Sequence, residues 1–206
     1  VIMRITVAYL IVISVGLLML SLVGCMSSQP NGSNATPTPA AFTPTPLLIS
    51  TPPPGAMLIT SCPYTVSSPG YYYLDSNLNA SDGCITIQAE GSNSVLDCQG
   101  YGITGQGNHQ GSGISLSGTS GVSVRNCVVS NFAKGIDLTD SSNSSITGNT
   151  ANSNGYGIYL FPFSSNNSIT GNRVTSNTYG IVLVESSSNN LAGNNASSNN
   201  ETGIYL

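Results

Sequence analysis

Aliphatic residues spaced two positions apart recur along most of the chain, and glycine, asparagine, serine and threonine fill the intervals. Residues with this spacing point to the same side of a β-strand, whereas a helix needs apolar positions three or four apart. The clearest copy is Gly-Ile-x-Leu, which begins at Gly113, Gly135, Gly157, Gly180 and Gly203. This period of 22 to 23 residues predicts a solenoid in which each coil stacks on the one before it.

Stacking the coils in register predicts four interior columns of aliphatic side chains. The columns are Ile114, Ile136, Ile158, Ile181 and Ile204; Leu116, Leu138, Leu160, Leu183 and Leu206; Val95, Val124, Ile146, Ile169 and Leu191; and Val129, Ala151, Val174 and Ala196. A single coil cannot shield these side chains from water, so the fold must be cooperative between neighbours. The sequence therefore predicts an all-β parallel β-helix with coils of about 22 residues.

A fifth column is polar and contains Asn149, Asn172 and Asn194, each directly after a glycine. Glycine permits the positive φ of a tight corner. Stacked amides can hydrogen-bond to one another and to the corner backbone, so the column predicts an asparagine ladder. In the earlier coils the same column continues with Cys98 and Cys127.

The cysteines of the repeat region suggest two disulfides. Stacking puts Cys98 and Cys127 on adjacent coils, roughly 4.8 Å apart, which is compatible with a bond. Cys62 and Cys84 would then form the second disulfide. Four cysteines allow three pairings, and the alternative is that Cys98 and Cys127 are reduced interior residues.

The residues before the regular repeat are predicted to form strands at 57–60, 71–74 and 84–88, separated by turn-forming residues. They do not follow the 22-residue period, so we interpret them as an N-terminal cap and the first wall of the helix. The first full coil is longer than the others, and we place its extra residues in the polar loop 105–111.

Residues 1–25 are typical of an export signal, because Arg4 precedes an apolar run that ends in Leu-Val-Gly-Cys. This ending resembles a lipobox and predicts lipidation at Cys25; the alternative is an uncleaved anchor helix. Residues 26–56 are rich in proline and threonine and predict an extended linker. Both interpretations place residues 57–206 outside the cytoplasm and tethered to a membrane. The chain begins with Val and ends within a repeat, so we expect a truncated gene product.

The recurring Ser-Ile-Thr-Gly-Asn, followed by Ser-Asn and Tyr-Gly-Ile-x-Leu, resembles the right-handed parallel β-helix repeats of NosD-like and carbohydrate-binding/sugar-hydrolase (CASH) proteins. The resemblance covers residues 60–206. It implies a surface or periplasmic protein, polysaccharide binding or cleavage in some members, and a role in copper-enzyme maturation for NosD-like members.

Charge and residue types narrow these functions. After residue 25 the cations are Arg125, Lys134 and Arg173, too few to neutralise many phosphates, so no nucleic-acid partner is expected. Copper needs thiolate, thioether or imidazole ligands, and the repeat region offers Met57, His109 and cysteines that we assign to disulfides. We therefore expect no metal site and no cofactor.

A polysaccharide-active enzyme would need clustered carboxylates with a nearby cation. The candidates are Lys134, Asp137, Asp140 and Glu185. We expect Asp140, Pro162 and Glu185 to share a column, with the carboxylates about 9.6 Å apart over two coils. This approaches the separation in inverting glycosidases. Nothing evident in the sequence raises the pKa of either carboxylate, so a polysaccharide-active enzyme is the alternative function and not the main prediction.

A saccharide-binding surface is the second hypothesis, with Tyr156, Tyr159, Tyr179 and Tyr205 predicted on the outer face. The third is a structural or adhesive role in the cell envelope, towards a polysaccharide or a surface protein, which needs no chemistry that the sequence lacks. Sequons at Asn31, Asn34, Asn79, Asn143, Asn166, Asn195 and Asn200 would permit glycosylation.

Overall fold

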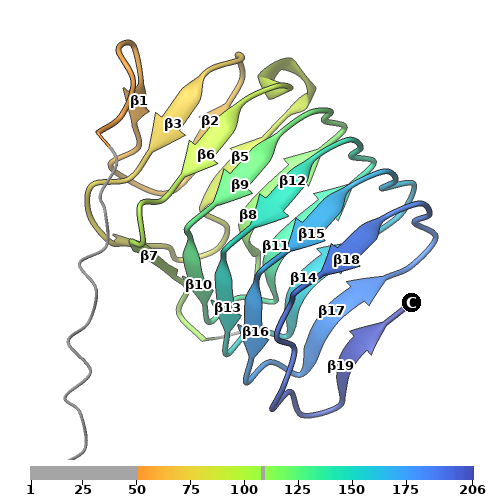
Figure 1. Ribbon diagram of the computed structural model, residues 1–206. Helices are drawn as coiled ribbons and strands as arrows, with labels where there is room; N and C mark the ends of the chain where they lie inside the picture. Colours follow the sequence, from red (N-terminus) through yellow and green to blue (C-terminus); the bar gives the residue numbers. More distant parts are fainter. Residues whose placement is uncertain (1–50, 108–109) are drawn as a thin grey trace, which may run out of the picture. The chain divides into compact units, whose positions relative to one another are not determined.

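The computed structural model describes residues 51–107 and 110–206, which wind into a parallel β-solenoid (Figure 1). The predicted fold class is therefore confirmed. The predictions for the signal segment, for Cys25, for His109 and for linker residues up to 50 lie outside the described residues. Within the described residues, no helix is long and apolar enough to cross a membrane.

Three parallel sheets form the walls, and we call them sheets A, C and B in the order in which each coil passes through them. Sheet A contains β1 (Met57–Leu58), β3 (Tyr71–Tyr73), β6 (Val95–Asp97), β9 (Ser123–Arg125), β12 (Ser145–Thr147), β15 (Ser168–Thr170) and β18 (Asn190–Ala192). Sheet C contains β4 (Leu78–Asn79), β7 (Gly102–Thr104), β10 (Val128–Ser130), β13 (Thr150–Asn152) and β16 (Arg173–Thr175).

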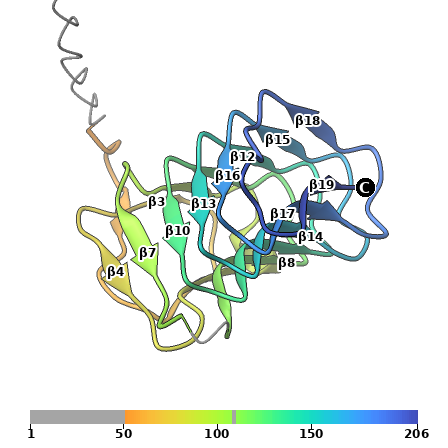
Figure 2. The same ribbon diagram turned by 90° about the horizontal axis from the view of Figure 1, so that it is seen from below.

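Sheet B contains β2 (Tyr64–Val66), β5 (Ile85–Ile87), β8 (Ser112–Ser117), β11 (Lys134–Thr139), β14 (Tyr156–Leu160), β17 (Tyr179–Leu183) and β19 (Thr202–Tyr205). In the described residues the only helical element is the 3₁₀ turn η1 (Ala89–Gly91). Figure 2 shows the coils following one another along the solenoid. The segment before the regular repeat supplies strands to all three sheets, so it includes the first coils of the solenoid.

The interior columns follow the predicted register over most of their length. Ile136 pairs with Ile114 and Ile158, and Val129 pairs with Ala151, all of them fully buried. The prediction for Val95 is wrong by one residue. Leu96 pairs with Val124 and is buried, because one residue lies between Leu96 and Cys98, whereas two residues lie between Val124 and Cys127.

The column of leucines ends before its predicted last member. Ile204 pairs with Ile181, but β19 ends at Tyr205, and Leu206 is 80% exposed. The extra residues of the first long coil lie at more than one corner, and not only in the loop 105–111 as predicted. The loop 105–111 is longer than its counterpart 131–133, but the corner 98–101 also exceeds its counterpart 126–127.

The predicted asparagine ladder is present at the corner between sheets A and C. The backbone N–H of Asn149 donates to Oδ1 of Asn172 at 2.9 Å, and that of Asn172 donates to Oδ1 of Asn194 at 3.0 Å. Gly148, which precedes the first of them, has a φ of +64°. Each amide Nδ2 also donates to a backbone carbonyl one coil earlier, as Asn172 does to Ile146 at 2.8 Å.

The other two corners have ladders that the sequence analysis missed. Asn154, Asn177 and Asn199 repeat the same bonds between sheets C and B. Between sheets B and A, one row runs from Ser144 through Asn167 to Asn189, and a second runs from Thr119 through Ser141 and Ser164 to Ser186. All three corners are therefore fixed by side chains that bond to the backbone of the neighbouring coil.

The two predicted disulfides, Cys62–Cys84 and Cys98–Cys127, are both formed. Their Cα atoms are 4.6 and 4.7 Å apart, as expected for residues on adjacent coils. Cys98 and Cys127 therefore occupy the interior as a bonded pair, and the alternative of two reduced thiols does not describe this structure.

Candidate functional site

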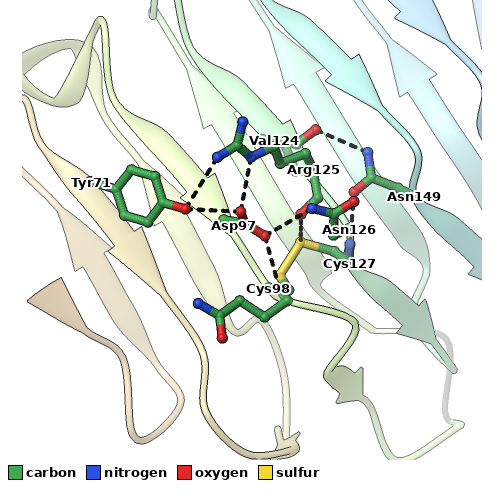
Figure 3. Close-up of polar contacts among 9 residues, drawn as sticks. Tyr71, Asp97, Cys98, Val124, Arg125, Asn126, Cys127 and Asn149 are labelled. Atoms are coloured by element: carbon green, nitrogen blue, oxygen red, sulfur yellow. Dashed lines mark hydrogen bonds and ion pairs between the residues drawn. A yellow bond between two sulfur atoms is a disulfide. The ribbon is translucent and has the colours of Figure 1, made fainter. Parts of the chain in front are cut away.

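Sheet A carries a network of polar side chains around Asp97 on its outer side (Figure 3). Oδ2 of Asp97 accepts hydrogen bonds from the Tyr71 hydroxyl and from Nε of Arg125, both at 2.9 Å. Oδ1 accepts bonds from Nδ2 of Asn126 and the backbone N–H of Gln99, both at 3.0 Å. Burial alone would raise the pKa of Asp97, but these donors and the positive charge of Arg125 lower it below its ordinary value.

This network is a structural feature of the early coils. Asp97 is 2% exposed and both of its oxygens are satisfied, so it offers a ligand no free acceptor. The network lies next to the Cys98–Cys127 bond and ties three coils together (Figure 3). The sequence analysis missed it, because Tyr71 and Asp97 lie in coils that do not follow the regular period.

The outer face of sheet B carries the four tyrosines that were predicted as saccharide-binding residues. Tyr156 pairs with Lys134 and Tyr179 in one outward column. The neighbouring outward column runs from Asp137 through Tyr159 and Val182 to Tyr205. The structure therefore brings all four tyrosines onto one face, in the two predicted columns.

The tyrosine rings pack against one another. Those of Tyr156 and Tyr179 stack on each other, with centroids 5.1 Å apart and an interplanar angle of 15°. The Tyr159 ring packs against Tyr156 at 4.8 Å and against Phe161 at 6.0 Å. One face of each ring in the stacked pair is thus covered by its neighbour, which limits where a ligand can stack.

A hollow lies beside Val182, which is 5% exposed and is the smallest residue in its stretch of the outward column. Val182 lies one coil after Tyr159 and one coil before Tyr205. The resulting hollow has a volume of about 270 Å³ and is lined by Tyr156, Tyr159, Tyr179, Val182, Val184 and Tyr205. We call this hollow the tyrosine slot. Two coils separate Tyr159 from Tyr205, so its two aromatic walls start about 9.6 Å apart.

A charged pair lies one coil before the tyrosine slot. Nζ of Lys134 is 2.9 Å from Oδ2 of Asp137 and 4.8 Å from the centroid of the Tyr159 ring. Asp137 is 6% exposed, and its Oδ1 is buried without a hydrogen-bond partner in the described part of the chain. Burial raises the pKa of Tyr159 above its ordinary value, and the neighbouring Tyr156 and the charges of Asp137 and Glu185 add to this effect.

The remaining carboxylate candidates lie at the corner that follows the strands of sheet B. Asp140 and Glu185 are exposed corner residues with φ values of +51° and +50°. The coil between them places Phe163 at this corner position, with a φ of +55°, and not Pro162 as predicted. The reason is that residues 161–163 make this corner one residue longer before the ladder serine. Phe163 is 70% exposed and separates the two carboxylates.

A larger hollow of about 390 Å³ follows the corner between sheets C and B. Its lining consists of glycine, asparagine, serine and threonine, including Asn131, Ser153 and Thr178. No aromatic or charged side chain lines it, so it offers neither a stacking surface nor an electrostatic anchor. Of these two hollows, the tyrosine slot is the one with aromatic rings on which a ligand could stack.

Copper does not fit the described residues. Soft or imidazole ligands are required, and the four cysteines of residues 51–107 and 110–206 are all in disulfides. Over the same residues, no three His, Cys, Asp or Glu side chains lie close enough together to hold a metal ion.

Comparisons with known proteins bear on the fold and the family. A protein-family model described as "Periplasmic copper-binding protein (NosD)" matches residues 56–206. The catalytic domain of a GH87 alpha-1,3-glucanase in complex with tetrasaccharides is similar in structure, with a TM-score of 0.44 and 15% sequence identity. The match covers 68% of this chain and 34% of that domain, so the chain spans about a third of its length. No curated protein matches the chain significantly.

Proposed function

Because the chain belongs to the NosD family, we propose that it is an extracytoplasmic β-helix protein with an adhesive role, and that it binds saccharides in the tyrosine slot. The observation that carries the proposal is the hollow of about 270 Å³ between Tyr159 and Tyr205. Aromatic rings stack well on the apolar faces of other rings. A hollow walled by several of them is a preferred kind of ligand site.

The dimensions of the slot suit one sugar ring. A ligand held between two aromatic walls needs a contact distance of about 3.5–4.0 Å on each side. A separation of about 9.6 Å between the coils of Tyr159 and Tyr205 leaves room for a puckered ring. Val182 lies in the lining between them, and Tyr156 and Tyr179, which also line the hollow, carry hydroxyls that can donate or accept hydrogen bonds. A flat aromatic ligand would fit the width less closely.

The other functions find less support. Asp137 is paired with Lys134, and the exposed Phe163 lies between Asp140 and Glu185, so the candidate residues do not form the acid–base pair of a glycosidase. The donor set does not fit copper. Tethering through Cys25 remains part of the proposal, since a membrane anchor would hold the binding face at the cell surface.

Filling the slot tests the proposal. Val182→Tyr adds a ring in a column whose neighbours, Tyr159 and Tyr205, are already tyrosine, so we expect the fold to tolerate it. The full-length protein in detergent should bind neutral oligosaccharides on a glycan array, and isothermal titration calorimetry should show that Val182→Tyr removes this binding.

Thr86→Tyr is the matched control, because it adds the same side chain to the same outward column, several coils away. We expect it to bind like the wild-type protein. The proposal is wrong if the wild-type protein binds no glycan, or if Val182→Tyr binds as tightly as the wild-type protein.

A further inference from the structure

The buried carboxylate of Asp137 is a second feature of the same face, and it is incompletely satisfied. Its Oδ2 contacts the Lys134 ammonium at 2.9 Å and accepts a longer bond from the Ser112 hydroxyl at 3.3 Å. Its Oδ1 has no partner within the described residues, although it is buried. An unsatisfied buried acceptor is costly, and in a native protein it requires an explanation, such as strain, a bound water or ion, or a functional role.

The contacts of the Lys134 ammonium show that the space between Asp137 and Tyr159 accepts a cation. The ammonium is held between the Asp137 carboxylate and the Tyr159 ring, at 2.9 and 4.8 Å. A carboxylate and an aromatic ring that both contact one ammonium form a site for a cation. Lys134 reaches this site from the same strand, and about a third of its side chain is exposed, so a ligand can compete for the position.

The charges around the slot are unfavourable for an acidic ligand. The negative charges of Asp137 and Glu185 are close enough to Tyr159 to raise its pKa, and Lys134 already forms an ion pair with Asp137. The other cations of residues 51–107 and 110–206 are engaged elsewhere: Arg125 with Asp97 on sheet A, and Arg173 with Thr175 on sheet C. A uronate or sulfated sugar would therefore find no cation available to pair with its charge.

We propose that Asp137 and Lys134 form a selective subsite beside the tyrosine slot, which accepts amino-bearing or neutral saccharides and rejects anionic ones. This inference rests on the proposed function, because the ligand must first occupy the slot. Asp137 neighbours Tyr159 in the outward column, so a saccharide that extends from the slot along the solenoid axis reaches it over the Tyr159 ring. There an amino group displaces Lys134 and donates a hydrogen bond to the carboxylate, whereas a neutral saccharide leaves the Lys134–Asp137 pair in place.

The experiment compares three probes with the full-length protein by isothermal titration calorimetry. The probes are chito-oligosaccharides with free amino groups, cello-oligosaccharides and oligogalacturonates of equal length. We expect the wild-type protein to bind the first two, and to bind the oligogalacturonates at least about tenfold more weakly, as like-charge repulsion in a partly buried site predicts.

Two variants separate the roles of the charged groups. Asp137→Asn keeps the shape of the side chain and removes its charge, so the ratio between amino-bearing and acidic probes should fall about tenfold. Lys134→Gln removes the internal competitor, so affinity for the amino-bearing probe should rise about fivefold while affinity for the neutral probe changes little. Thermal unfolding of each variant checks that the fold is retained, and Lys134→Gln keeps the test valid if Asp137→Asn is unstable.

The outcomes distinguish this inference from the proposed function. If no probe binds the wild-type protein, both are wrong. If Val182→Tyr blocks binding but the probe ratio is the same in the wild-type protein and both variants, the slot is a saccharide site and the selective subsite is wrong. Preferential binding of oligogalacturonates by the wild-type protein also overturns the subsite.

Discussion

The early and the late coils of the solenoid are held at the same corner by different chemistry. Between sheets A and C, the early coils are joined by the Cys98–Cys127 disulfide and the hydrogen bonds of Asp97. The late coils are joined by the amides of Asn149, Asn172 and Asn194. The two systems meet where the backbone N–H of Cys127 donates to Oδ1 of Asn149 at 3.0 Å.

This difference follows from the regularity of the coils. An asparagine ladder needs corners of equal length, because each amide oxygen must reach the N–H of the equivalent residue in the preceding coil. The early corners differ in length, as the pairing of Leu96 with Val124 shows. A disulfide and a charged network do not need a repeat, so they can fasten coils in which the sequence departs from the period. We infer that cross-links compensate for irregularity in this fold.

The largest effect is expected from removing the disulfide between the early coils. Cys98→Ala/Cys127→Ala opens a loop with a sequence separation of 29. The loop-entropy model predicts a loss of about 3–4 kcal/mol in the free energy of unfolding. Urea unfolding at neutral pH measures it. An unchanged midpoint would show that the polar network alone holds the early coils together.

A smaller loss is expected from interrupting the ladder of the late coils. Asn172→Ala leaves the buried backbone N–H of Asn149 without its acceptor and removes the bond to the Ile146 carbonyl. Such a change costs about 2–3 kcal/mol. The control is Asn152→Ala on the outer side of β13, where we expect a change of at most about 0.5 kcal/mol. Equal unfolding midpoints for the two variants would contradict the structural role of the ladder.

The smallest effect is expected from the charge of Asp97, and it depends on pH. Because the pKa of Asp97 is lower in the folded state, its ionised form stabilises the protein above the unfolded pKa of about 3.9. This contribution is lost as the pH falls through the folded pKa. Asp97→Asn should therefore show a smaller fall in melting temperature between pH 5 and pH 2 than the wild-type protein. Parallel curves for the two proteins would rule out this role.

Much of the fold could be predicted from the sequence, because a solenoid repeats its physical requirements at a fixed interval. The period gave the register of Ile136 and Val129, the corner glycines and the first asparagine ladder. The same reasoning misplaced Val95, since one residue fewer between this strand and Cys98 moves the residues of the strand to the opposite face. The second ladder of Asn154 was missed although its Ser-Asn pair recurs, because this pair was interpreted as part of the family signature and not as a stacked column.

The candidate site could be predicted only in part. The alternation of inward and outward residues along a strand placed Tyr159 and Tyr205 on the outer face. The 22- to 23-residue spacing of the coils placed Tyr156 beside Tyr179. The sequence does not show that these last two rings stack on each other, nor that Val182 lines a hollow. Those features depend on side-chain packing between coils. The buried state of Asp137 depends in the same way on the positions of Lys134 and Tyr159.

The position of Val182 has a consequence for how such a protein can change during evolution. Its side chain points away from the core, and its neighbours in the column show that both small and large residues are accepted there. Exchanging a large residue for a small one in any coil would open a new recess without disturbing the interior columns. Ligand preference can thus diverge through single codon changes, while the scaffold that carries it is inherited unchanged.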